Sequence, residues 1–117
     1  MTVKFGDQRL HWQYVEEVAD MTAVALSSER HSEGQVYNAF GDCRSWREAA
    51  QILKQVKPQL DVKVENEFDT VLAGTVEDYQ TVGFSRDYGA DRQWPLEAGI
   101  RATLETYSKM AASGSLS

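Results

Sequence analysis

Residues 5–19 read FGDQRLHWQYVEEVA, and within this stretch a strand pattern changes into a helix pattern. Residues 3–15 form two short extended segments around the polar turn Gly6-Asp7-Gln8. Trp12 and Tyr14 are two residues apart, so they lie on one face of a strand. From position 15 to about 28, apolar residues return every three to four positions, as in an amphipathic helix. The chain is therefore expected to belong to the α/β class, in an α+β-like form.

The middle of the chain continues this alternation of strands and helices. Residues 35–40 are predicted to form a strand that stops at the Gly41-Asp42 pair. Ser45 and Glu48 have the spacing of a capping box, which predicts the start of a second helix, and Pro58 ends it.

The last part of the chain predicts one more strand and one more long helix. Residues 60–65 alternate apolar and polar side chains, as a short strand does. A final helix follows Pro95, and its apolar residues are Leu96, Ile100, Thr103, Leu104, Tyr107 and Met110. We expect a small mixed β-sheet with three to four helices, in one domain over residues 1–110 with a flexible tail over 111–117.

The composition excludes several functional classes. The 117 residues suffice for one domain, and their net charge of −6 leaves no basic stripe for nucleic acid. No apolar stretch approaches the roughly 20 residues that cross a bilayer, and no secretory leader pattern is seen at the start. Cys43 is the only cysteine and has no partner for an internal disulfide. A cytoplasmic location without membrane or nucleic-acid partners is the simplest expectation.

Three patterns span nearly the whole chain. They are FGDQ (5–8) with WQYVEEVA (12–19), GQVYN (34–38) with SWREAA (45–50), and YG (88–89) with LEAGI (96–100) and Tyr107. They resemble the closing part of extended short-chain dehydrogenases/reductases, the nucleotide-sugar epimerase and dehydratase group. The family counterparts are a Gly-Asp-Gly turn before aromatic-x-(His or Tyr)-Val-Asp-Asp-Val-Ala, a Tyr-Asn strand with its helix, and a closing Leu-Glu-Glu-Gly-Ile. The resemblance implies a C-terminal, substrate-binding part, incomplete without the Rossmann half.

The catalytic and cofactor motifs of that family are missing from the sequence. The family binds NAD(P) on a Gly-rich turn, but none of the eight glycines here begins a Gly-x-Gly. The family's acid–base pair is Tyr-x-x-x-Lys. The residues four positions after the five tyrosines are Val18, Gly41, Gly83, Arg92 and Ala111. We therefore predict no catalytic residue, no cofactor and no oxidoreductase activity in this chain alone.

Some affinity for a nucleotide sugar remains possible on this resemblance. The residues it implies for substrate binding are Arg9, Trp12, Tyr14, Asn38 and Arg86. In the family, an arginine just before the first aromatic residue holds the substrate diphosphate, because a guanidinium binds phosphate oxygens in pairs. By spacing that position is Leu10, so Arg9 would serve only if the strand shifted by one residue. Ala90 and Arg92 also depart from the family pattern.

Other polar residues offer weaker alternatives. His11, His31 and Cys43 lack the spacing of metal ligands, so no metal site is predicted. Glu16 and Asp20 share a helix face, where acids near the first turn complement the helix dipole. The alternating carboxylates Glu65, Glu67 and Asp69 could crowd and raise one pKa, as in a small acid-dependent hydrolase, or form an exposed acidic edge.

An isolated substrate-binding part has a physical consequence. In the family, the first helix and the Tyr-Asn strand lie against the nucleotide-binding sheet. Without that sheet, the strand edge at 36–40 and an apolar helix face would be open to water. We expect the chain to cover them as a homo-oligomer, most simply a two-fold dimer, or on a partner protein. The alternatives are one half of a split NAD-dependent enzyme completed by another chain, and a folded gene fragment.

Overall fold

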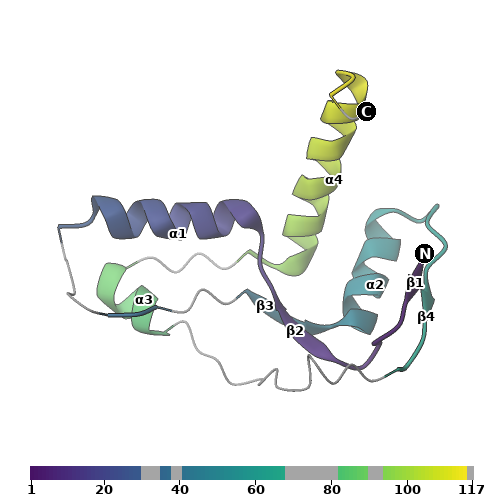
Figure 1. Cartoon of the computed structure of the whole chain (residues 1–117), viewed down its shortest axis with the longest axis horizontal. Helices are drawn as coiled ribbons and strands as arrows, with labels where there is room; N and C mark the ends of the chain where they lie inside the picture. Colours follow the sequence, from purple (N-terminus) through teal and green to yellow (C-terminus); the bar gives the residue numbers. More distant parts are fainter. Residues whose placement is uncertain (30–34, 38–40, 68–81, 90–93, 116–117) are drawn as a thin grey trace.

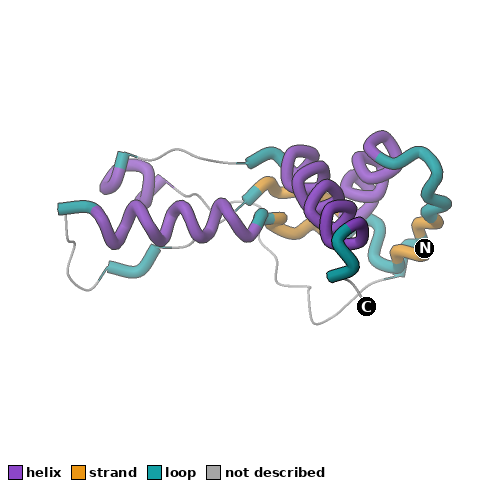
Figure 2. Tube along the Cα trace, turned by 90° about the horizontal axis from the view of Figure 1, so that it is seen from above, coloured by secondary structure: helices purple, strands orange, loops and turns teal. Residues whose placement is uncertain are grey.

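The computed structural model describes residues 1–29, 35–37, 41–67, 82–89 and 94–115 (Figure 1). In chain order the elements are β1 (Thr2–Val3), β2 (Arg9–Trp12), α1 (Val15–Ser27), β3 (Asp42–Ser45), α2 (Trp46–Val56), β4 (Lys63–Val64), α3 (Val82–Tyr88) and α4 (Leu96–Ala112). The radius of gyration is 16.9 Å, above the roughly 13 Å of a compact domain of this length. Figures 1 and 2 show the reason, since α1 and α3 extend away from the end that holds α2 and α4.

The four strands of the described residues form two separate pairs. β1 pairs with β4 in parallel, with Val3 opposite Val64. β2 pairs with β3 in antiparallel orientation, from Arg9 opposite Ser45 to Trp12 opposite Asp42. The predicted α/β class is confirmed, and parallel and antiparallel pairing both occur, but in two small sheets instead of one.

One predicted strand is in a different place. Residues 35–37 are irregular, and residues 38–40 lie outside the described part. The strand β3 begins at Asp42, where we expected the predicted strand to stop. The pairing with β2 explains this position, because Arg9–Trp12 needs a neighbour for its backbone groups. Gly41 permits the close approach, since an added Cβ there would lie 1.7 Å from the Trp12 carbonyl oxygen.

The second helix follows the sequence prediction closely. The Ser45 hydroxyl accepts a hydrogen bond from the Glu48 backbone N–H at 3.1 Å, and the Glu48 carboxylate accepts one from the Ser45 N–H at 2.8 Å. This capping box fixes the first turn of α2. Ala49 and Ala50 are the buried residues of α2, which packs against α4, β3 and β1. The helix ends at Val56, two residues before Pro58.

The first helix forms as predicted, but its apolar face is open to water. Val15, Val18 and Leu26 are 72%, 39% and 78% exposed. Glu17 is the only buried residue of α1. We expected this face to be uncovered without the nucleotide-binding sheet, and the exposures confirm it. Val36 is also exposed, although residues 35–37 form no strand edge.

A small aromatic cluster joins Tyr37 to two residues of α3. The ring of Tyr37 meets Phe84 and Tyr88 edge-on, with centroids 5.7 Å and 5.4 Å away. Phe84 is 5% exposed and is among the few buried apolar side chains described. No described helix is both long and apolar enough to span a membrane.

Candidate functional site

The structure does not bring together the four described residues of the five predicted for substrate binding. Trp12 and Tyr14 line one pocket between β2, α2 and α4. Arg9 lies at the opposite end of β2, and Arg86 lies on α3. Asn38 lies outside the described residues. Only Trp12 and Tyr14 are therefore brought together, and nucleotide-sugar binding by this set stays a prediction.

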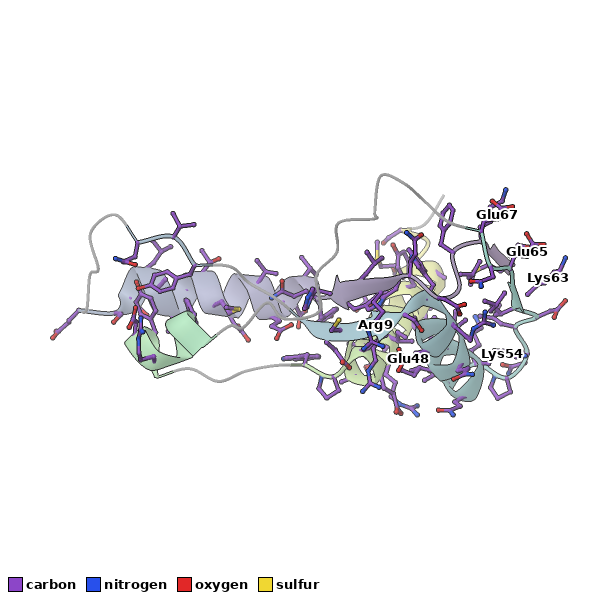
Figure 3. The ribbon with its side chains drawn as sticks, turned by 90° about the horizontal axis from the view of Figure 1, so that it is seen from below. Arg9, Glu48, Lys54, Lys63, Glu65 and Glu67 are labelled. Atoms are coloured by element: carbon purple, nitrogen blue, oxygen red, sulfur yellow. The ribbon has the colours of Figure 1, made fainter. Side chains whose placement is uncertain are left out.

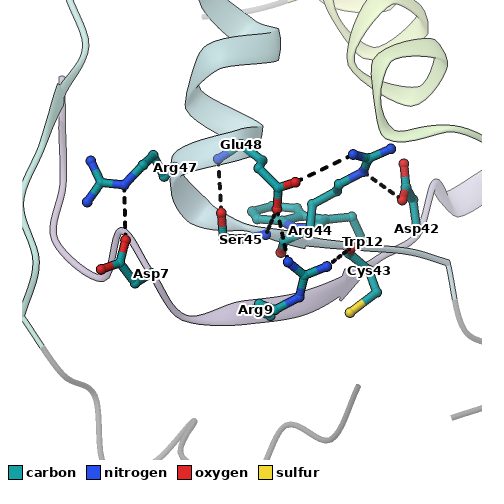
Figure 4. A network of polar contacts seen from close by, with 9 residues as sticks. All are labelled: Asp7, Arg9, Trp12, Asp42, Cys43, Arg44, Ser45, Arg47 and Glu48. Atoms are coloured by element: carbon teal, nitrogen blue, oxygen red, sulfur yellow. Dashed lines mark hydrogen bonds and ion pairs between the residues drawn. The ribbon is translucent and has the colours of Figure 1, made fainter. Parts of the chain in front are cut away.

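Arg9 belongs to a polar network that ties β2 to β3 and α2 (Figure 4). Its Nη2 donates to the Cys43 carbonyl oxygen at 2.9 Å, and its Nη1 lies 3.4 Å from Glu48 Oε2. The pKa of Glu48 is lowered, first by the Ser45 backbone N–H and then by the nearby arginines Arg9 and Arg44. The guanidinium of Arg9 is thus directed at protein groups, so a diphosphate would have to displace Glu48 to bind it.

Asp42 connects this network to the last helix. Its Oδ1 accepts a hydrogen bond from Arg44 Nε at 2.9 Å, and its Oδ2 accepts one from the Leu96 N–H at 3.1 Å. The second bond satisfies a backbone donor in the first turn of α4, as a capping side chain does. Trp12 Nε1 donates to the Arg44 carbonyl oxygen at 3.0 Å. These bonds fix where α4 starts relative to β2 and β3.

The acidic residues near β4 form ion pairs with lysines. Lys63 Nζ lies 2.8 Å from Glu65 Oε1, and Lys4 Nζ lies 3.8 Å from Glu67 Oε2 (Figure 3). The hydrogen bond from Lys63 lowers the pKa of Glu65, which is the opposite of crowding between carboxylates. Asp69 lies outside the described residues. An exposed acidic edge therefore fits better than the acid–base pair of a hydrolase.

Arg86 is paired within its own helix. Its Nε donates to Asp87 Oδ1 at 2.9 Å, and the Tyr37 hydroxyl donates to Asp87 Oδ2 at 2.6 Å. The pKa of Asp87 is lowered, first by Arg86 and then by Tyr37. Arg86 belongs to α3 and Arg9 to β2, and these two elements lie apart (Figure 1), so this geometry does not place the two side chains on one anionic ligand.

Glu17 is the polar residue that sequence reasoning missed. It lies in the first turn of α1, where acids complement the helix dipole, and its side chain is only 1% exposed. Its Oε1 accepts the Trp94 N–H at 3.0 Å, while its buried Oε2 has no hydrogen-bond partner among the described residues. Burial is the main reason that the pKa of Glu17 is raised. The only sequence signal was its place in the Val-Glu-Glu-Val stretch, which resembles the family's Val-Asp-Asp-Val.

Trp12 and Tyr14 lie beside a pocket whose lining is mostly apolar. Its volume is about 280 Å³. α2 contributes Leu53, α4 contributes residues including Gly99, and Trp94 comes from the segment before α4. Sequence reasoning identified the two β2-side aromatics and missed the rest, because their meeting depends on how α4 packs.

No metal-binding arrangement is found among the residues that the structure describes. They contain no group of three or more His, Cys, Asp or Glu side chains that could hold an ion. His11 Nδ1 lies 3.3 Å from the Gly41 carbonyl oxygen, and Cys43 is a half-buried free thiol. His31 lies outside the described residues, so the prediction of no metal site stays a prediction.

Comparison with known proteins places the fold. No protein-family profile and no curated protein sequence matches the chain. Two solved structures are similar, each with a TM-score of 0.69: a partial consensus L-threonine 3-dehydrogenase at 20% identity, and TunA, a NAD-dependent NDP-hexosamine 5,6-dehydratase involved in tunicamycin biosynthesis, at 24% identity. The matches cover 90% and 92% of this chain but only 36% and 35% of those chains.

The chain thus spans about a third of the length of these two enzymes. One is a dehydrogenase and the other a NAD-dependent dehydratase. The identities are low, so the likeness is one of fold. The chain has the fold of about a third of each of these two enzymes.

Proposed function

We propose that the chain is a non-catalytic, free-standing module that acts by association through the apolar face of α1. One observation carries the proposal: Val15, Val18 and Leu26 are exposed along one stripe of a 13-residue helix. An amphipathic helix normally turns such a stripe toward a core. Exposed apolar patches on soluble chains mark interaction surfaces.

A second copy of the chain is the simplest occupant of this face. A helix of 13 residues is about 20 Å long, enough for three turns of side chains to meet a partner helix. The acids Glu16 and Asp20 lie in its N-terminal half. In an antiparallel, two-fold pairing over the full helix the two copies of Glu16 lie at opposite ends, and Asp20, near the middle of the helix, lies by its spacing on the side away from the apolar stripe, so like charges do not face each other. The predicted homodimer therefore suits the charge pattern of α1.

The mass of the protein in solution tests this proposal. We expect light scattering at micromolar concentration to give twice the chain mass of 13.2 kDa. Val18→Glu together with Leu26→Gln should return the monomer, because the paired face would bury a charge. Tyr107→Gln is the matched control, since Tyr107 is an exposed apolar residue on α4. A wild-type chain that stays monomeric at about a hundred micromolar would refute self-association.

A separate chain that completes the enzyme is the second candidate. It is favoured by the comparison, because both similar structures are nearly three times as long as the part that matches. The same α1 face would then bind a chain that carries a Gly-rich turn and a Tyr-x-x-x-Lys pair. Co-purification of the two chains in a one-to-one complex that binds NAD, lost with the α1 double variant, would support this reading over the homodimer.

Weak affinity for nucleotide sugars is a further part of the proposal. It is supported by the substrate class in the name of TunA. The paired state of Arg9 argues for low affinity. A thermal-shift series with nucleotide sugars tests it, since ligand at about a hundred times its dissociation constant adds roughly 2.7 kcal/mol of stability. An unchanged melting temperature at millimolar nucleotide sugar would remove this part.

A further inference from the structure

The pocket between β2, α2 and α4 has a chemistry that differs from a nucleotide-sugar site. Its described lining residues carry no charged side chain. Trp12 Nε1 donates to the Arg44 carbonyl oxygen, and Thr103 Oγ1 donates to the Gly99 carbonyl oxygen at 2.8 Å. These two donors are already engaged by the protein, so the lining favours an uncharged, apolar ligand.

Aromatic rings supply much of the wall. The rings of Tyr14 and Trp94 are tilted by 33° with centroids 4.8 Å apart, and both residues line the pocket. Trp12 lines it too, and its ring is held edge-on against Trp46 at 4.6 Å. Aromatic side chains attract further rings in stacked or edge-on arrangements. A planar aromatic molecule can therefore make contacts here that an aliphatic molecule of equal size would lack.

The volume narrows the ligand size. An apolar cavity of about 150 Å³ is known to hold a single benzene ring. The pocket here is close to twice as large, at about 280 Å³. Gly99 helps to shape this space, because a Cβ at that position would meet the Tyr14 Cβ at 3.3 Å and push the two walls apart.

We propose that this pocket binds an uncharged planar aromatic molecule of two fused rings, of the size of indole or naphthalene. The site lies between α2 and α4 and does not use the exposed face of α1. It is therefore independent of the association proposed above, and either can fail without the other.

Indole is the probe for the test. In spectra of the ¹⁵N-labelled chain we expect indole to shift the side-chain Nε1–H signals of Trp12 and Trp94 in a saturable way. For nine non-hydrogen atoms in an apolar pocket, a dissociation constant of about 1 mM or lower is reasonable. Indole-3-acetate, which has the same rings and a negative charge, should bind at least about tenfold more weakly.

A variant that fills the pocket tests where indole binds, and a variant on the exposed part of α4 is its matched control. Thr103→Phe places a ring in the pocket and should weaken indole binding by about tenfold or more. Ser108→Phe adds the same ring on the exposed part of α4 and should change binding less than about twofold. If circular dichroism shows that Thr103→Phe has unfolded the chain, Thr103→Leu replaces it. Shifts that do not saturate, or that are equal in the filled and control variants, would overturn the proposal.

Discussion

The region around β2, β3 and α2 and the region around α1 are built in different ways. In the first, residues far apart in sequence meet in pairs, such as Arg9 with Glu48 and Trp12 with Trp46. In the second, a 13-residue helix buries one residue, Glu17, and exposes most of its apolar stripe. The side chains of the first region find their partners within the chain, whereas the apolar face of α1 is open to water. The difference separates a region whose contacts are made within the chain from the helix face that the proposed association would cover.

Gly41→Ala should lower the free energy of unfolding most, because it disrupts the pairing of β2 with β3. The new Cβ would lie 1.7 Å from the Trp12 carbonyl oxygen, so β2 and β3 would have to separate. We expect a loss of about 3 kcal/mol in the free energy of unfolding, the upper range for overpacking with backbone shifts. Urea denaturation measures it, with Val36→Ala at an exposed position as control. An unchanged midpoint would mean that the β2–β3 pairing is not closely packed.

Asp42→Ala should have the second largest effect on the free energy of unfolding. It removes the acceptor for the Leu96 N–H and the partner of Arg44 at once. Loss of a capping carboxylate in this half-buried setting should cost about 2 kcal/mol. Asp42→Asn keeps an oxygen for the Leu96 N–H, so its cost should stay below about 1 kcal/mol. Equal losses in the two variants would show that the ion pair, and not the cap, holds α4 in place.

Glu17→Gln should raise the free energy of unfolding at neutral pH, whereas the two preceding variants lower it. Because burial raises the pKa of Glu17, the folded chain binds a proton more readily than the unfolded chain. This contribution to stability is fully present below the unfolded pKa, near the ordinary value of 4.5, and is lost as pH rises through the folded pKa.

The neutral glutamine should therefore gain about 1 kcal/mol over the wild type at pH 7, and less at pH 4. Thermal melts of both proteins across pH measure the difference, with the exposed neighbour changed in Glu16→Gln as control. A gap that widens toward acid pH would contradict the buried carboxylate.

Leu26→Gln should have the smallest effect on the folded monomer. This side chain is 78% exposed at the far end of α1, so its removal takes no apolar surface out of a core. We expect a change below about 0.5 kcal/mol in unfolding at concentrations where the chain is monomeric. A loss as large as that of Asp42→Ala would show that the α1 face is already covered within one chain.

Local sequence patterns were sufficient for α1, α2 and α4, but they did not predict α3. The capping box at Ser45 and the apolar spacing after Pro95 placed α2 and α4, and the change of period at Val15 placed α1. Such patterns act through neighbours within a few residues, so they can be read from one chain. The motifs also indicated the family whose fold the similar structures share.

Contacts between residues far apart in the sequence could not be predicted from local patterns. β3 has the sequence DCRS, which has no apolar alternation, and it is a strand because β2 provides its hydrogen-bond partners. Glu17 is buried by contacts with the segment before α4, which lies 77 residues later. The pocket needs α2, α4 and β2 together, so only Trp12 and Tyr14 of its lining were proposed.

The aromatic cluster of Tyr37, Phe84 and Tyr88 gives the end of the molecule beside α1 a small core of its own. Backbone amides exchange with solvent deuterium through local opening, and regions with separate cores open separately. We therefore expect two classes of amide protons: slow ones in α2, whose inner face is packed on α4, and fast ones in α1 and α3. Binding of a partner on α1 would then appear first as slower deuterium uptake in that helix, before any change in the α2 amides.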